Sequence, residues 1–391
     1  MRPTARLRAA RLLAGPLLVS LLAAAVLPGC ATAPDEPRAA ARGEPAGPER
    51  DRVLHACRAA ATALRTGDYA GAKARLDDAL ARVGGLIVDD AAAARARSLF
   101  AAEDTKVFLG EPYERVMAYY YRGILYWRDG EPDNARACFR SAQFTDAGAA
   151  DARYAADYLL LDYLEGLATT KLQGDGADAL ARARALAGER FRLPDYAPGA
   201  NVLVFAEYGY GPRKYAAGRY GEELRFQVED SPSRSARLVL HEGRTVVPLP
   251  PYDDLGFQAT TRGGRVMDHV LQGKAVFKES TDAFGTGAII AGAGVAIAGQ
   301  SNTAQGVGLG LVAAGLVSKI ISAATTPAAD TRGWSNLPNL LSFAALKLPV
   351  GQHSLRVEFK DPGGRIVVTR DATFHVVPGR DTVLFLSDRN S

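Results

Sequence analysis

Cys30 is the residue whose setting points most directly to chemistry, because its thiol follows a segment typical of protein export. Residues 1–29 carry no acidic residue and four arginines, Arg2, Arg6, Arg8 and Arg11. The apolar run LLAGPLLVSLLAAAVL follows and ends in small residues. A basic start, an apolar centre and a small-residue end form the order of a secretory signal peptide. The run is also shorter than the roughly 20 residues of a spanning helix, so we expect residues 1–29 to be removed.

The residues directly before Cys30 refine this prediction. Leu27, Pro28 and Gly29 resemble the lipobox of bacterial lipoproteins, which has Leu three residues before the cysteine and Gly directly before it. The resemblance implies that Cys30 is acylated on its thiol, becomes the first residue after cleavage and is acylated on its amino group. Ala31, where inner-membrane sorting uses Asp, implies an outer-membrane lipid anchor that faces the periplasm of the bacterial cell envelope. The alternative is an ordinary signal peptide in which Cys30 has no role.

The charge balance excludes a general attraction to nucleic acid. Removal of residues 1–29 takes four of the 47 basic residues and none of the 43 acidic ones, which leaves a formal net charge of zero. We therefore expect no nucleic-acid partner. Residues 30–50 are rich in Pro, Ala and charge and offer little to bury, so we predict a flexible tether there.

The remaining reactive side chains form no recognisable catalytic or metal-binding pattern. There is no GxSxG or HExxH motif. Cys57 and Cys138 could form a disulfide in the periplasm or remain buried thiols. The histidines lack metal-ligand spacing, and they are His55, His241, His269, His353 and His375. We expect no cofactor and no metal, and an enzymatic activity is unsupported.

The segment KVFLGEPYERVMAYYYRG, residues 106–123, has an unusual concentration of polar and aromatic side chains. Its candidate partner-binding residues are Glu111, Tyr113, Glu114, Arg115, Tyr119 and Tyr120. These side chains could form a recognition spot beside a groove, or the polar ones could simply cap the helix that follows the break at Gly110 and Pro112. The segment resembles a family of uncharacterised bacterial lipoproteins with tetratricopeptide-like helices. The resemblance covers much of the chain and implies no established activity.

Residues 51–192 must supply the helices that position this segment. The run YYYRGILYWRDGEPDNARACFRSAQ has Gly123, Tyr126, Gly130, Ala135, Phe139 and Ala142. This order resembles the tetratricopeptide repeat, in which small residues let paired helices approach closely. Looser copies precede it around Gly67 and follow it around Gly166. We predict a tetratricopeptide-like α-solenoid, with a generic helical bundle as the alternative.

Residues 199–391 change to a strand pattern. Apolar and polar residues alternate in GQHSLRVEFK, and DPGG and VVPGRDT are hairpin turn signals. The start of this run, LPVGQHSLRV, resembles the beginning of a strand in small periplasmic β-domains. We predict an α+β protein whose second part is an antiparallel, immunoglobulin-like or transthyretin-like β-sandwich. Trp334 is expected to be buried and to pin the strands to the preceding part.

A glycine-rich apolar hairpin, residues 284–321, is predicted as an insert in the strand region. Its two apolar halves flank the polar turn QSNTAQ; the first half has no charge and the second has none before Lys319. The glycines expected to pack helices are Gly292, Gly294, Gly306 and Gly310. Each half is about 16 residues, roughly 24 Å as helix, which is short of the ~30 Å hydrocarbon core. The hairpin could enter the membrane or self-associate through its GxxxG pattern, or it could pack inside the protein.

These observations favour a lipid-anchored scaffold whose helical repeats present a concave surface to a protein or peptide partner. The rival hypothesis is a membrane-inserting homo-oligomer assembled through the glycine-rich hairpin. A weaker alternative is a periplasmic enzyme or ligand carrier that uses a cleft between helices and strands.

Overall fold

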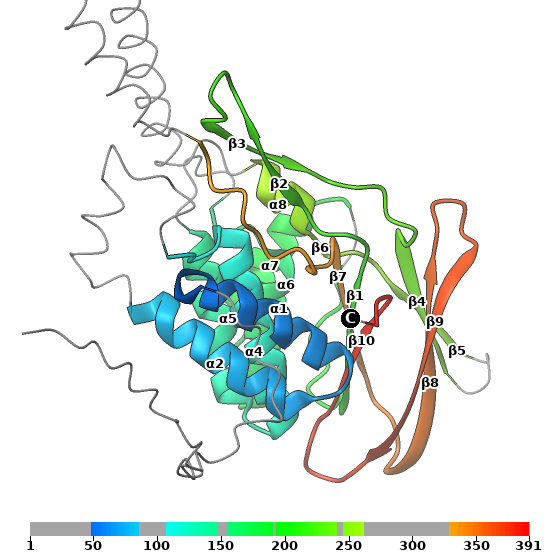
Figure 1. Ribbon diagram of the computed structural model, residues 1–391. Helices are drawn as coiled ribbons and strands as arrows, with labels where there is room; N and C mark the ends of the chain where they lie inside the picture. Colours follow the sequence, from blue (N-terminus) through cyan, green and yellow to red (C-terminus); the bar gives the residue numbers. More distant parts are fainter. Residues whose placement is uncertain are drawn as a thin grey trace, which may run out of the picture. The chain divides into compact units, whose positions relative to one another are not determined.

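The computed structural model describes residues 48–85, 107–147, 155–190, 193–240, 245–261 and 328–390. All of them belong to one compact unit, Ala46–Ser391. The predicted signal peptide, Cys30, most of the tether and the glycine-rich hairpin 284–321 lie outside the described residues. Within those residues the fold is α+β, with helices on one side and sheets on the other (Figure 1).

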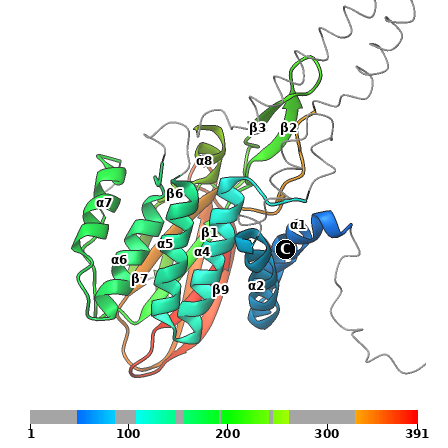
Figure 2. The same cartoon turned by 90° about the vertical axis from the view of Figure 1, so that its left-hand side faces the viewer.

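The N-terminal part of the described chain is helical, as the sequence predicts. Its elements are η1 (Glu49–Asp51), α1 (Arg52–Arg65), α2 (Tyr69–Gly85), α4 (Pro112–Asp129), α5 (Pro132–Asp146), α6 (Leu159–Lys171) and α7 (Ala177–Ala187). Short turns join α1 to α2, α4 to α5 and α6 to α7, so each pair runs antiparallel. Gly130 ends α4 with φ 89°, a left-handed conformation that favours glycine. Figure 2 shows the helices side by side.

Small residues at the helix contacts have the packing role that the sequence predicts. A Cβ atom on Gly123 of α4 would lie 2.6 Å from a ring carbon of Phe139 on α5. A Cβ atom on Gly166 of α6 would lie 2.9 Å from the Cβ of Ala179 on α7. Such distances are below van der Waals contact, so only glycine permits these approaches. The prediction of close helix pairing at these positions is confirmed.

The strands form two four-stranded sheets and a separate two-stranded ribbon among the described residues. The first sheet has the order β10-β1-β7-β6, made of β10 (Thr382–Ser387), β1 (Val202–Tyr208), β7 (Leu340–Leu346) and β6 (Asp253–Asp254). The second has the order β5-β4-β8-β9, made of β5 (Thr245–Leu249), β4 (Ser235–Leu240), β8 (Gly351–Lys360) and β9 (Ile366–Val376). The ribbon pairs β2 (Arg213–Ala217) with β3 (Glu223–Gln227), and the short helix α8 (Leu255–Thr261) follows β6.

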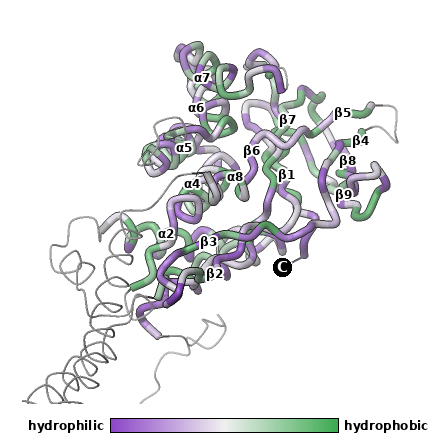
Figure 3. Tube along the Cα trace, turned by 90° about the horizontal axis from the view of Figure 1, so that it is seen from above, coloured by the Kyte–Doolittle hydropathy of each residue, from purple (hydrophilic) through white to green (hydrophobic). Residues whose placement is uncertain are grey.

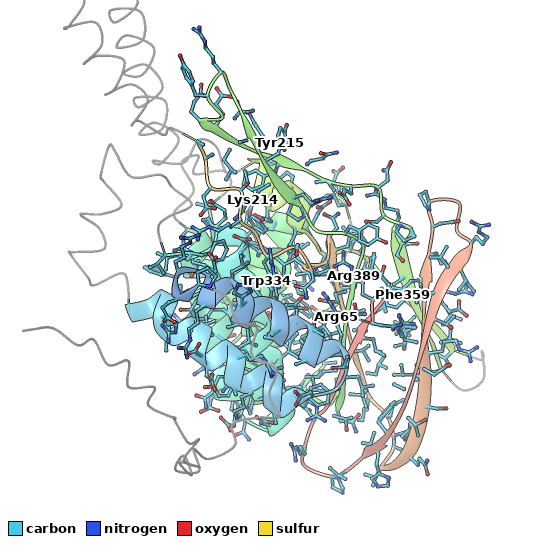
Figure 4. All side chains as sticks on the ribbon, in the orientation of Figure 1. Arg65, Lys214, Tyr215, Trp334, Phe359 and Arg389 are labelled. Carbon is cyan, nitrogen blue, oxygen red and sulfur yellow. The ribbon has the colours of Figure 1, made fainter. Side chains whose placement is uncertain are left out.

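Strand β1 lies in the middle of the layered core and is buried along its whole length. Side chains of a strand alternate between its two faces. Val202 and Val204 therefore join the apolar cluster shared with β4 and β8, whereas Leu203 and Phe205 join the cluster shared with the helices. Figure 3 shows β1 between the helices and the β4–β8 strands, and Figure 4 places Phe359 of β8 on the opposite side of β1 from the helices. The change from helices to strands thus does not separate two independent cores.

The prediction of a wholly antiparallel strand region is wrong in one respect. The β8–β9 hairpin forms at DPGG as expected, with Gly364 N donating to Asp361 O. The VVPGRDT turn, however, does not make a hairpin, because β10 leaves β9 and pairs parallel to β1 in the other sheet. A turn signal fixes a change of direction but not the strand with which the next segment pairs.

The first helix of each pair faces the sheet. Helices α1 and α4 contact β10, and α6 contacts β7. Tyr120 of α4 and Phe205 of β1 lie in the same buried cluster, with ring centroids 6.3 Å apart. The face that a solenoid of such pairs would offer to a partner is therefore occupied by the chain's own sheet. The expectation of a free concave helical surface is wrong.

Candidate functional site

The residues predicted as a recognition spot lie at the start of α4, where the break at Gly110 and Pro112 begins the helix. Glu114 is only 3% exposed, and its carboxylate accepts hydrogen bonds from three directions. The donors are Lys214 Nζ at 2.6 Å, Trp334 N at 2.6 Å and Glu111 N at 2.6 Å. The Glu111 contact caps α4, which agrees with the capping alternative. The other two contacts tie the helix to β2 and to the segment before β7.

Three of the predicted partner-binding side chains are inaccessible. Tyr113, Glu114 and Tyr120 are buried, and burial raises the pKa of Tyr113 and of Tyr120 well above the ordinary value of a phenol. Glu111, Arg115 and Tyr119 are only partly buried. A recognition surface built from all six residues is therefore wrong. An apolar helix face turned inward needs its aromatic side chains for packing, which leaves few of them for a partner.

Trp334 has the anchoring role predicted for it. Its side chain is buried, its ring centroid lies 5.8 Å from that of Tyr121, and its backbone N–H donates to Glu114. Neighbouring contacts hold the same segment on α1, because Arg58 donates to Gly333 O and Asn336 Nδ2 donates to Arg58 O. Figure 4 shows Trp334 against the helices.

A second buried polar cluster joins the helices to β1. Glu207 accepts from Arg65 Nε of α1 at 2.6 Å and from the Tyr121 hydroxyl of α4. The Arg65 and Glu207 side chains are 0% and 1% exposed. Burial is the largest single influence on the pKa of Arg65 and lowers it, but the charge and hydrogen bond of Glu207, together with the charges of Tyr121 and Asp388, leave this pKa raised overall. Burial, followed by the charge of Glu207, holds the pKa of Tyr121 well above its ordinary value. This cluster fixes the helices against the sheet and has no open face for a substrate.

A third buried carboxyl caps a helix that is far from it in the sequence. Asp253 of β6 accepts from Leu159 N and Leu160 N at the start of α6, each at 2.9 Å. Burial raises the pKa of Asp253 to about 7, although the two N–H donors act in the opposite direction. Its partners are main-chain groups of the same fold, so we assign it a structural role.

One open site in the described part of the molecule lies where the ends of the helices meet the ends of the strands. We call it the rim cleft, and it is lined by Trp127, Gly130, Pro132, Lys171, residues 198–201, Val350 and residues 377–381. Its volume is about 370 Å³, at the lower end of the range of about 300–1,000 Å³ for ligand pockets. The lining residues come from several helices and loops at the edge of the fold, so a ligand can bind there without a rearrangement of the core.

Hydrogen bonds hold the charged side chains of the rim cleft in place. Asp381 accepts from Lys171 Nζ at 2.8 Å and from Trp127 Nε1 at 2.9 Å, so β9–β10, α6 and α4 meet at one carboxylate. Lys171 also donates to Ala200 O, and Arg380 donates through Nη2 to Arg128 O at 2.6 Å. These contacts hold Lys171, Arg380 and Asp381 in place at the edge of an accessible cleft. Charged groups held in this way are suited to binding a ligand.

None of the other predicted site residues is among the residues that line this cleft. Cys30 and the glycines Gly292, Gly294, Gly306 and Gly310 lie outside the described residues. Cys57 and Cys138 are both free thiols, so the possible disulfide between them is not formed, and burial raises the pKa of each. Within the described ranges no group of three or more His, Cys, Asp or Glu residues could hold a metal ion. No helix in that part of the chain has the length and apolar character to cross a membrane.

The sequence contains only a partial signal for the buried-cluster and cleft residues that were not predicted from it. Glu207 interrupts the apolar run VLVFAEY, and a charge in such a strand predicts a buried partner. Nothing local identified Arg65 as that partner. The rim cleft had no signal either, because Lys171 and Arg380 come from distant segments with no shared motif.

Comparison of the chain with protein-family models, with curated proteins and with solved structures found no match. The resemblances drawn from the lipobox and from residues 106–123 therefore stay predictions.

Proposed function

We propose that the protein is a lipid-anchored lipoprotein of the bacterial cell envelope that binds a peptide segment of a partner protein at the rim cleft. Cys30 would carry the acyl anchor, and residues 31–47 would belong to the tether between the anchor and the described body. Several acyl chains contribute about 0.8 kcal/mol per buried CH₂, which makes such an anchor stable. No enzymatic activity is supported by the sequence or by the described residues.

The rim cleft is the observation that carries this proposal. Two of its lining residues are among the exposed large hydrophobic side chains, Val350 at 60% and Val377 at 41%. Leu172, next to Lys171 at the end of α6, is also exposed. Exposed apolar side chains around a cleft with fixed polar groups are typical of a binding site.

We also propose that the three helix pairs are tetratricopeptide-like repeats and that the two larger sheets form a β-sandwich. The close approaches at Gly123 and Gly166 support the repeats, and the apolar cluster shared by β1, β4 and β8 supports the sandwich. The repeats would bind the protein's own sheet, and the partner would bind where helices and sheet end. The rival membrane-inserting assembly depends on residues 284–321, outside the described residues, and stays a prediction.

Site-specific photo-crosslinking in cells tests the proposed function. A photoreactive amino acid is placed at Val350 or at Val377, and the adducts are mapped by mass spectrometry. Because both positions line one cleft, we expect the same partner attached at both. The matched control is Val246 of β5, which is 49% exposed and does not line the cleft. Absence of a shared adduct, or the same adducts at Val246, would contradict binding at the rim cleft.

A further inference from the structure

The charges of the rim cleft do not cancel. Lys171 and Asp381 form an ion pair with an Nζ–Oδ1 distance of 2.8 Å, and they neutralise each other. Arg380 is exposed and, within the described part of the chain, forms no ion pair. Its Nη2 donates to the uncharged Arg128 carbonyl, and its remaining guanidinium donors are available. The cleft therefore carries one positive charge in excess.

The position of this charge is fixed by the end of α4. The Arg380 guanidinium is hydrogen-bonded to Arg128 O and lies beside Gly130, where a Cβ atom would be 3.7 Å from Nε. A guanidinium held in one place loses less conformational entropy when it binds an anion, and its planar group of donors matches a carboxylate. These properties favour a ligand with a carboxylate over one that is merely apolar.

The walls of the cleft consist largely of residues with small or cyclic side chains. Gly130, Gly199, Gly379 and Ala200 line it together with three prolines. Such walls bring main-chain N–H and C=O groups within reach of a ligand, and Val350 and Val377 add apolar surface at the edge. A ligand that matches all three features has alternating donors and acceptors, an apolar side chain and a negative group. The C-terminal end of a peptide has them in a volume of this size.

We infer that the rim cleft binds the C-terminal residues of a partner protein and that Arg380 pairs with the terminal α-carboxylate. This inference rests on the proposed function, since it names the part of the partner that the cleft recognises. Backbone groups and a cation are a known means of capturing a chain terminus. The last side chain of the ligand would contact Val350 and Val377. Lys171 and Asp381 would shape the cleft, but they would not bind the carboxylate of the ligand.

The experiment compares peptides that differ only in the terminal charge. The probes are N-acetylated tripeptides Ala-Ala-X, in which X is Val, Leu or Phe, each made with a free carboxylate and as the C-terminal amide. Binding to the purified protein is measured by isothermal titration calorimetry. We expect at least one carboxylate to bind about tenfold more tightly than its amide, as for loss of one charge-assisted hydrogen bond. Arg380→Gln should reduce this ratio to near one, and Arg380→Lys should keep part of it.

The control variant is Arg365→Gln, an exposed arginine in the β8–β9 turn that is paired with Asp361 and lies at the opposite end of the β8–β9 hairpin from Val350 and Val377. It should leave the ratio unchanged. Equal affinities of acid and amide would overturn the role of the carboxylate, while leaving peptide binding at the cleft in place. No binding of any tripeptide would overturn the recognition of a chain terminus, and the crosslinking at Val350 and Val377 would still decide the proposed function. Binding of octanoate or inorganic phosphate in place of the peptides would assign the excess charge to another anion.

Discussion

Removal of one charge from the buried Arg65–Glu207 pair is expected to destabilise the protein more than the small change in side-chain volume alone would. Glu207 Oε1 lies 2.6 Å from Arg65 Nε, and both side chains are almost fully inaccessible. Nη1 and Nη2 of Arg65 are buried and have no hydrogen-bond partner among the described residues. Glu207→Gln therefore leaves a buried guanidinium without the carboxylate to which it is hydrogen-bonded. A buried pair broken in this way typically costs about 3–5 kcal/mol of the free energy of unfolding.

The double variant separates this effect from lost packing. Arg65→Met together with Glu207→Leu removes both charges, and apolar replacements of a buried pair are often close to neutral. The Tyr121 hydroxyl then loses its acceptor, which costs about 1–3 kcal/mol. We therefore expect the double variant to lose less than the sum of the single variants, Arg65→Met and Glu207→Leu, with a coupling energy of at least about 2 kcal/mol.

The assay is equilibrium urea denaturation of the purified protein, with the free energy of unfolding taken from linear extrapolation. A matched cycle on Arg356 and Asp371 serves as the control. That pair has a comparable distance of 2.7 Å, but its side chains are 52% and 65% exposed. Water screens such exposed pairs, so they contribute little to the free energy of unfolding. If the buried pair shows no larger coupling than the exposed pair, the burial of Arg65 and Glu207 does not determine their energetics and the reasoning is refuted.

Three further predictions concern the core, the helix packing and the anchor. Between about pH 4 and pH 7 the unfolded chain has released the Asp253 proton while the folded state, with a pKa of about 7, still holds it. The folded state binds more protons there, so stability falls as pH rises, by up to about 1.4 kcal/mol per pH unit. Asp253→Asn should remove this contribution in urea titrations at several pH values, and exposed Asp133→Asn should not. Gly123→Val should lower the free energy of unfolding by about 1–3 kcal/mol, because its Cβ would overlap Phe139; an unchanged urea midpoint would contradict the packing. Cys30→Ser should move the protein from the membrane fraction to the soluble fraction of cells, and retention in the membrane would argue for another attachment.

Local patterns were sufficient for much of the secondary structure. The periodicity of residues 51–192 predicted helices, the alternation in β8 predicted a strand, and DPGG predicted its turn. Each of these depends on residues that are near one another in the chain. The rim cleft could not be predicted in the same way, because Lys171, residues 198–201 and Arg380 meet only after the helices pack on the sheet.

The outcome at residues 106–123 has an equally physical cause. The polar and aromatic side chains around Glu114 are an uncommon combination, and the sequence alone left recognition and capping as alternatives. The choice depends on what lies opposite α4, and there the structure has Lys214, Trp334 and the strand β1. Groups of the same chain therefore supply the hydrogen bonds and the packing that a separate protein could also have supplied.

The sequence by itself predicts an export-like start ending at Cys30, which stays a prediction, and it determined the helices, most of the strands and the small residues at the tight contacts of Gly123 and Gly166. These features follow from hydropathy order, periodicity and side-chain size, which act over a few residues. Only the tertiary structure decided that β10 pairs parallel to β1, that Glu207 pairs with Arg65, and that the inner helical face is covered. Long-range pairing is set by which apolar surfaces can be buried together, and a carboxylate or a strand edge carries no local mark of its eventual partner.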